Sequence, residues 1–142
     1  MNLGPSPERF ELTISVGAQD IDLLGHVNNV VYVRWVQDAA IAHWNAAATT
    51  AQKASVGWVV VRHEIDYKYP ARLRDEIIAR TWVGTANKNI FERHTEILRA
   101  QDLKLLARAR SLWCPVDMHS GKPTRVGSDI RERFSILDTG EY

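Results

Sequence analysis

The chain has 142 residues, of which 45% are hydrophobic and 25% charged, and its formal net charge is +1. This length suits one domain with a sizeable core, which we expect to span residues 1–142, and the composition is that of a globular protein rather than a disordered one. The near-neutral charge gives no support to nucleic-acid binding, and no apolar run is long enough to cross a membrane.

The number and spacing of the cysteine and histidine residues bear on disulfides, metal binding and the cellular compartment. The single cysteine, Cys114, excludes an intrachain disulfide and a cysteine metal cage, and it fits a reducing compartment. No histidine or carboxylate spacing typical of a metal site occurs. The first residues lack a basic segment followed by an apolar run, so no signal peptide is predicted. We therefore expect a cytoplasmic protein without a metal or a membrane partner.

The first half of the chain predicts a strand and a long helix. Apolar and polar residues alternate over residues 10–16, which favours a strand, and an acidic loop follows over residues 17–27. Asn28 is a suitable cap for a helix that runs to about residue 48. Apolar residues recur there at helical spacing, and the expected buried side consists of Val33, Val36, Ala40 and Trp44. Val30, Ala39 and Ile41 are expected to widen this side. A second, short helix is expected over residues 49–55.

After Gly57 the hydrophobic period changes to two. The alternation predicts four strands, and in the first of them every second residue from Val59 to Tyr69 is expected to share the apolar face. The strands are expected over residues 58–69, 75–85, 90–100 and 103–116. Because short turns join them, they should pair antiparallel. Residues 128–134 predict a terminal helix capped by Ser128. The expected class is α+β, with one long helix wrapped by a five-stranded antiparallel sheet.

Residues that can carry chemistry gather where the acidic loop meets the long helix. Asp22 can activate water or attack a carbonyl, and the free N–H groups of a helix N-terminus can stabilise an oxyanion. His26 either orients a substrate or fixes the loop, and Gly25 supplies a backbone conformation or a close approach. Asn28 and Asn29 favour structural roles, although Asn29 could also bind Asp22 or a substrate. The neighbouring Asp20 is expected to be a solvated loop carboxylate or a turn former.

The pattern Asp22-x-x-Gly25-His26-Val27-Asn28-Asn29-x-x-Tyr32 resembles the signature of hotdog-fold acyl thioesterases. The resemblance covers roughly residues 8–118, and its nearest groups are the 4-hydroxybenzoyl-CoA thioesterase-like and acyl-ACP thioesterase-like proteins. It implies a hotdog fold and hydrolysis of an acyl-CoA or acyl-ACP thioester, with no cofactor and with Asp22 as general base or nucleophile. In plant acyl-ACP thioesterases Asp, Asn and His recur at alternate positions, whereas here Leu24 stands in place of the Asn.

The resemblance also bears on assembly and on phosphate binding. One helix leaves a sheet face and two sheet edges uncovered, and the related proteins build active sites between subunits, so a homodimer or homotetramer is expected. The phosphates of coenzyme A or acyl carrier protein call for basic residues, for which Arg72, Arg74 and Lys88 are the candidates. The alternative function is a non-catalytic hotdog protein that binds acyl thioesters.

Overall fold

The computed structural model describes residues 8–87, 89–134 and 136–138. Its elements, in chain order, are β1 (Phe10–Ser15), the 3-10 helix η1 (Ala18–Asp20), α1 (Asn29–Ala47), α2 (Thr50–Ser55), β2 (Val56–Tyr67), β3 (Glu76–Asn87), β4 (Ile90–Arg99), β5 (Lys104–Asp117), α3 (Ser128–Arg133) and β6 (Leu137–Asp138).

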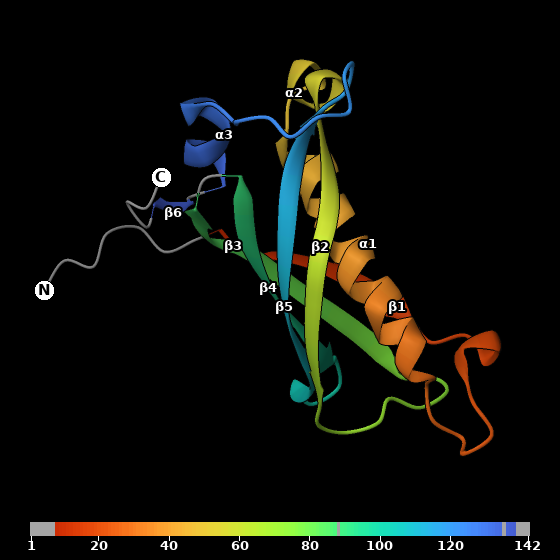
Figure 1. Cartoon of the computed structure of the whole chain (residues 1–142). Helices are drawn as coiled ribbons and strands as arrows, with labels where there is room; N and C mark the ends of the chain where they lie inside the picture. The colour runs from red at the N-terminus through yellow and green to blue at the C-terminus, as the bar shows by residue number, and fades with distance from the viewer. Residues whose placement is uncertain (1–7, 88, 135, 139–142) are drawn as a thin grey trace, which may run out of the picture.

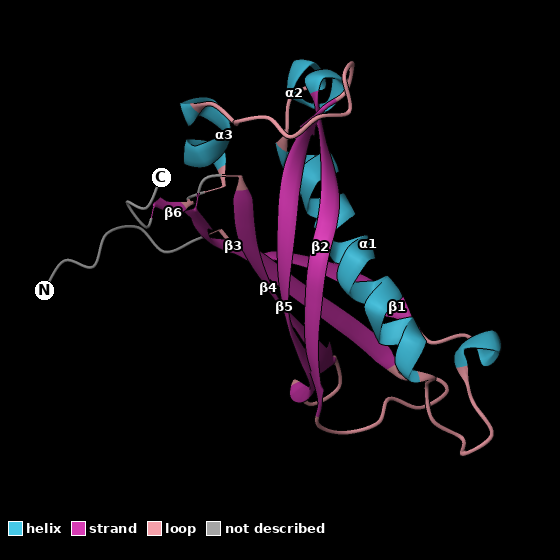
Figure 2. Ribbon diagram, in the orientation of Figure 1, coloured by secondary structure: helices cyan, strands magenta, loops and turns pink. Residues whose placement is uncertain are grey.

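The strands form one sheet in the order β1-β3-β4-β5-β2, with every neighbouring pair antiparallel. The two-residue strand β6 adds a short parallel pairing to β3, which the sequence did not predict. The long helix α1 lies along one face of the curved sheet, where it packs mainly against β1, β3 and β4 (Figure 1). This is the hotdog arrangement, and it confirms the expected α+β class (Figure 2).

The long helix begins and ends within one residue of the predicted bounds. The Asn28 side-chain oxygen accepts a hydrogen bond from the Val30 N–H at 3.0 Å, which confirms Asn28 as the cap. The buried side of α1 differs from the expectation, since Val30 and Ile41 are 72% and 53% exposed. Their place on the buried side is taken by residues closer to the sheet: Val31, Tyr32, Trp35 and His43.

The edge strand β2 contains a bulge that reverses its alternation. Val60 pairs with Trp113 and Arg62 with Leu112, so Val61 is the extra residue. Beyond the bulge His63 and Tyr67 lie on the helix side of the sheet, as predicted. Before the bulge, the alternation of side chains between the two faces of the sheet is shifted by one residue. The prediction that Val59 shares a face with them is therefore wrong.

The short helices lie at the end of the molecule where α1 finishes (Figure 1). Thr49 caps α2 with its side chain, which accepts a hydrogen bond from the Gln52 N–H. The residue before α3 is Gly127, so Ser128 is the first helical residue and not the cap. No helix in the described part of the chain has both the length and the apolar character that crossing a bilayer requires.

Asp20 ties the acidic loop to α1. The carboxylate is 3% exposed, so of the two expected roles the solvated side chain is wrong, and the turn former agrees with the structure. It accepts hydrogen bonds from the Gly17 N–H and from the Arg34 guanidinium, each at 2.9 Å. Burial alone would raise the pKa of Asp20, but the Gly17 N–H and the Arg34 cation outweigh it and lower that pKa below its ordinary value. Asp20 is therefore a structural carboxylate.

Replacing Asp20 with Asn is expected to lower the free energy of unfolding by about 1–3 kcal/mol at neutral pH, because a buried charge-assisted hydrogen bond is lost. A carboxyl whose folded pKa is depressed contributes stability above its unfolded pKa and loses it as the pH falls through the folded value. The difference between wild type and Asp20→Asn should therefore be complete above about pH 4 and shrink in stronger acid.

Urea unfolding between neutral and strongly acidic pH measures this difference. Asp38→Asn removes an exposed carboxylate from the same region and serves as the control, with little expected effect. A difference between wild type and Asp20→Asn that stays constant down to the lowest pH would contradict the assignment.

Candidate active site

The loop before α1 is a tight turn held by several backbone hydrogen bonds. The Asp22 N–H donates to the His26 carbonyl at 2.8 Å, and the Gly25 N–H donates to the Asp22 carbonyl at 3.1 Å. The Val27 N–H donates to the carbonyl of Ala71, in the loop between β2 and β3, at 2.9 Å. These bonds join the turn to the sheet and fix it at the N-terminal end of α1.

The Asp22 carboxylate is held by one of its two oxygens. Oδ1 accepts hydrogen bonds from the Leu24 N–H at 2.9 Å and from the His26 N–H at 3.3 Å. Oδ2 accepts none from the residues that the structure describes, and the side chain is only half-buried. The carboxylate is thus oriented through one oxygen while the other is open to a bound molecule.

The other motif residues set up this geometry. Gly25 has φ +78°, a left-handed conformation that favours glycine, and a Cβ there would meet no atom within 4 Å. The conformational explanation of Gly25 is confirmed, and the close-approach explanation is not. Asn28 holds the Val30 and Val31 N–H groups. Among the described residues, the Asn29 N–H at the start of α1 has no acceptor.

The motif lines a cleft of about 400 Å³ together with the end of β2. Asp22, Leu24, His26, Asn28 and Asn29 form one wall. The residues of the opposite wall include four in succession, which the sequence analysis did not identify: Tyr67, Lys68, Tyr69 and Pro70. The Tyr67 hydroxyl donates to the Asn29 carbonyl at 3.0 Å, which joins the two walls. Tyr67 and Asn29 are about forty residues apart in the sequence, so no local pattern indicated this contact.

The basic candidates are distributed unevenly around this cleft. Arg72 and Arg74 are exposed in the loop that follows Pro70, next to the cleft but not in its lining. Lys88 lies outside the described residues. Lys68 lines the cleft, so it is the one cation that the structure adds to those predicted.

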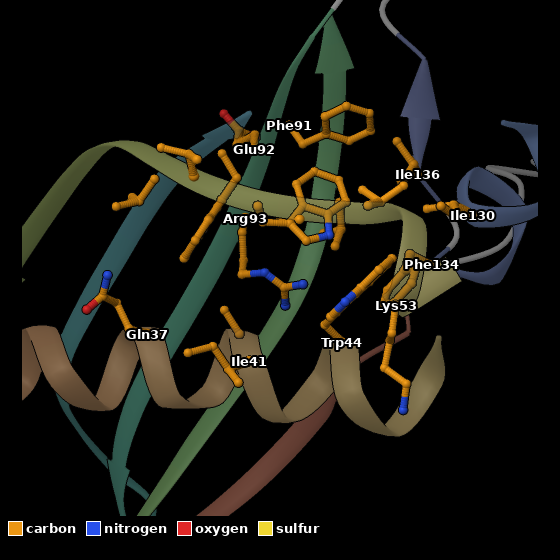
Figure 3. Close-up of a pocket in the computed structure, with 18 of the residues that line it drawn as sticks. Gln37, Ile41, Trp44, Lys53, Phe91, Glu92, Arg93, Ile130, Phe134 and Ile136 are labelled. Carbon is orange, nitrogen blue, oxygen red and sulfur yellow. The ribbon is translucent and has the colours of Figure 1, made fainter. Parts of the chain in front are cut away.

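A second and larger cavity, of about 580 Å³, lies nearer the other end of α1 (Figure 3). Its walls come from the C-terminal half of α1, the N-terminal half of β2, the strands β3, β4 and β5, and α3. They are mostly apolar and aromatic, as in Ile41, Trp44, Val60, Phe91, Trp113 and Phe134. Pockets for small molecules usually have such walls and volumes of roughly 300–1,000 Å³.

Arg93 extends from β4 into the space between the sheet and α1 (Figure 3). Its Nη1 donates to His43 Nδ1 at 3.0 Å and to Thr81 Oγ1 at 3.1 Å. His43 is fully buried. Burial, reinforced by the Arg93 cation, lowers the pKa of His43 to about 4, which keeps the imidazole neutral at physiological pH.

Within the described residues, no group of three or more histidine, cysteine or carboxylate side chains could hold a metal ion.

Solved structures of similar shape include several thioesterases. A 1,4-dihydroxy-2-naphthoyl-CoA thioesterase from Synechocystis matches with a TM-score of 0.78 and 19% identity, over 92% of this chain and 98% of that one. A Thermus thermophilus thioesterase solved with coenzyme A and zinc matches with a TM-score of 0.74 and 23% identity, over 87% of this chain and 90% of that one. At these identities the likeness shows the fold.

The sequence comparison gives the family. No curated protein is similar enough in sequence to be matched. The sequence model of the thioesterase-like superfamily, however, matches residues 16–134, which include the Asp22 turn, α1 and strands β2 to β5. On this match, the chain belongs to the thioesterase-like superfamily.

Proposed function

We propose that the protein hydrolyses an acyl thioester of coenzyme A or acyl carrier protein. The observation that carries the proposal is the Asp22 carboxylate in the cleft wall, with Oδ1 fixed by two backbone N–H groups and Oδ2 without a hydrogen-bond partner among the described residues. The membership of the thioesterase-like superfamily supports the same reaction.

In the proposed reaction Oδ2 of Asp22 takes a proton from a water molecule as the water oxygen attacks the thioester carbonyl. The carbonyl oxygen becomes an oxyanion, for which the Asn29 N–H at the positive end of the α1 dipole is the assigned donor. The C–S bond then breaks, and the thiolate takes up the proton held by Asp22. His26, in the same cleft wall, orients the thioester.

Direct attack by Asp22 Oδ2 on the carbonyl is the other route for the same residue. Mass spectrometry of enzyme quenched during a single turnover separates the two routes. Only the nucleophilic route leaves an acyl group on Asp22, whereas general-base catalysis leaves the enzyme mass unchanged.

We further propose that the working enzyme is at least a homodimer joined through β2. This strand pairs with β5 on one side, and its other side has no partner strand in the described chain; Val59, Val61 and Tyr67 on it are about half exposed. Val30 and Ile41 of α1 are exposed beside the two cavities that β2 lines. A second copy would cover these apolar side chains.

Two-fold symmetry would make the paired β2 strands antiparallel. The N-terminal half of β2 lines the large apolar cavity, and residues from Tyr67 to Pro70 line the Asp22 cleft. Antiparallel pairing would bring the Asp22 cleft of one subunit beside the apolar cavity of the other. We propose that the acyl chain occupies that cavity while its carbonyl lies at the partner's Asp22.

The cations near the cleft suit the phosphate-bearing part of the substrate. Lys68 lines the cleft and Arg72 and Arg74 follow it, and we assign these side chains to the substrate phosphates. A reducing cytoplasm is the compartment we propose, because coenzyme A and acyl carrier protein substrates are handled there and Cys114 has no cysteine to pair with.

Asp22→Asn keeps the shape of the side chain but provides neither a base nor a nucleophile. We expect turnover of the best acyl thioester to fall at least about a hundredfold with little change in KM, since general-base catalysis contributes roughly 10²- to 10⁴-fold. His26→Ala should cause a smaller loss. Thiol release from a panel of short, long and aromatic acyl-CoAs and acyl carrier proteins measures both.

Asp102→Asn, in the turn between β4 and β5, is the matched control and should keep wild-type turnover. Near-normal turnover of Asp22→Asn would refute the catalytic assignment. Binding of acyl-CoA by a wild type that hydrolyses none of the panel would favour the non-catalytic alternative instead.

Val61→Lys tests the proposed interface, because it puts a charge on the β2 edge. Light scattering at micromolar concentration should find wild type as a dimer or tetramer and the variant shifted toward monomer, with a parallel loss of turnover. Leu103→Lys, an exposed apolar site in the turn between β4 and β5, should change neither property. A monomeric wild type, or a monomeric variant with full turnover, is incompatible with a site shared between subunits.

A further inference from the structure

Arg93 is a charged side chain in the mostly apolar wall of the large cavity. It is 8% exposed and lies on the helix-facing side of β4, where its neighbours at alternate positions are Phe91, Thr95 and Ile97. Burial lowers the pKa of Arg93 to about 10, which still leaves the guanidinium positively charged at neutral pH. The folded chain therefore keeps a full positive charge in the wall of the large cavity.

No described carboxylate forms an ion pair with this guanidinium. Its two hydrogen-bond partners, His43 Nδ1 and Thr81 Oγ1, are neutral. The carboxylate of the adjacent Glu92 points away from the cavity and binds His94 and Arg110 (Figure 3). A buried charge without a counter-charge is costly, and buried charges in proteins are normally paired.

The hydrogen bonds from Arg93 lead through His43 to a negative charge, that of Glu8. It accepts from His43 Nε2 and is paired with Arg133. Since His43 donates through Nε2, its Nδ1 is the acceptor that Arg93 requires. The imidazole therefore orients the guanidinium without neutralising it.

Two further donors in the cavity wall have no acceptor. Trp58 and Trp113 both line the cavity, and the indole Nε1–H of each is buried without a hydrogen-bond partner among the described residues. An indole N–H can only donate, and so can a guanidinium. The two indole N–H groups and the Arg93 guanidinium can therefore each bind a hydrogen-bond acceptor, and the charge of the guanidinium favours an anion.

We propose that this cavity binds an acyl group whose far end carries a carboxylate, and that Arg93 is the residue that selects it. This inference rests on the proposed function, since the acyl group is the part of the thioester assigned to the cavity. The apolar and aromatic walls suit the methylene chain, and the planar guanidinium suits a carboxylate, which it can bind through two parallel hydrogen bonds. The substrate class is thus the mono-thioester of a dicarboxylic acid.

The test compares pairs of acyl-CoAs of equal chain length that end either in a carboxylate or in a methyl group, such as suberoyl-CoA and octanoyl-CoA. At the best length, kcat/KM of wild type should favour the carboxylate member by roughly tenfold to a hundredfold, the usual worth of a charged hydrogen bond. Arg93→Met should abolish or reverse this preference. Arg80→Met, on the opposite face of the sheet, is the matched control and should keep it.

The outcomes separate the inference from the proposed function. Hydrolysis by wild type without a carboxylate preference at any length overturns the inference and leaves the thioesterase proposal standing, even if Arg93→Met does not fold. If wild type hydrolyses no thioester, the fluorescence of the cavity tryptophans is titrated with methyl hydrogen suberate and with methyl octanoate. Binding of the first and not the second by wild type, lost in Arg93→Met, supports the carboxylate site, and equal binding of both overturns it.

Discussion

The hydrogen bonds that fasten the start of α1 to the sheet are the constraint on which the proposed site depends. The Asn28 N–H donates to the Asp20 carbonyl at 2.8 Å, and the Val27 N–H reaches the Ala71 carbonyl. The buried Tyr32 hydroxyl accepts from the Ala71 N–H at 2.8 Å. Because these bonds come from the loop, the helix and the β2–β3 connection, the three segments hold one another in place.

This clamp orients the Asp22 carboxylate before any substrate of the proposed reaction binds. The turn already supplies two N–H donors to Oδ1, and Oδ2 has no hydrogen-bond partner among the described residues. Pre-organised groups of this kind account for a large part of enzymatic rate enhancement. The clamp has a second consequence, since it keeps Asp22 at one end of α1 while the large apolar cavity lies nearer the other end.

The separation of the two cavities explains why a second subunit is proposed. In the described part of one chain, the cleft that holds Asp22 and the large apolar cavity are separate, and the carboxylate in the lining of that cavity, Glu92, is bound to His94 and Arg110. The edge strand β2 lines both, one with each of its ends. Two-fold pairing of that strand joins the complementary halves twice, which produces two equivalent sites from one arrangement.

Local sequence signals predicted most of the fold. Asn28 marked the start of the helix, and the change of period after Gly57 marked the sheet, because caps and periodicity depend on neighbouring residues. The bulge at Val61 left no trace in an alternating sequence, so the faces of β2 were wrong before it.

The candidate site was likewise predicted where it depends on neighbouring residues and missed where it depends on distant ones. The Asp22 turn was predicted from one contiguous motif. The burial of His43 and Asp20, and the contact of Arg93 with His43, depend on residues far apart in the sequence. Tyr67 and Lys68 belong to the cleft for the same reason, and no local pattern indicated it.

The most direct test of the shared site is complementation between two inactive variants. Asp22→Asn removes the carboxylate, and Ile41→Trp fills the mouth of the apolar cavity from its exposed position on α1. In a mixed dimer one site carries both changes and the other carries neither, so purified heterodimers should regain about half of the wild-type turnover per dimer. Heterodimers as inactive as the two parents would contradict the account, because each site would then be built within a single chain.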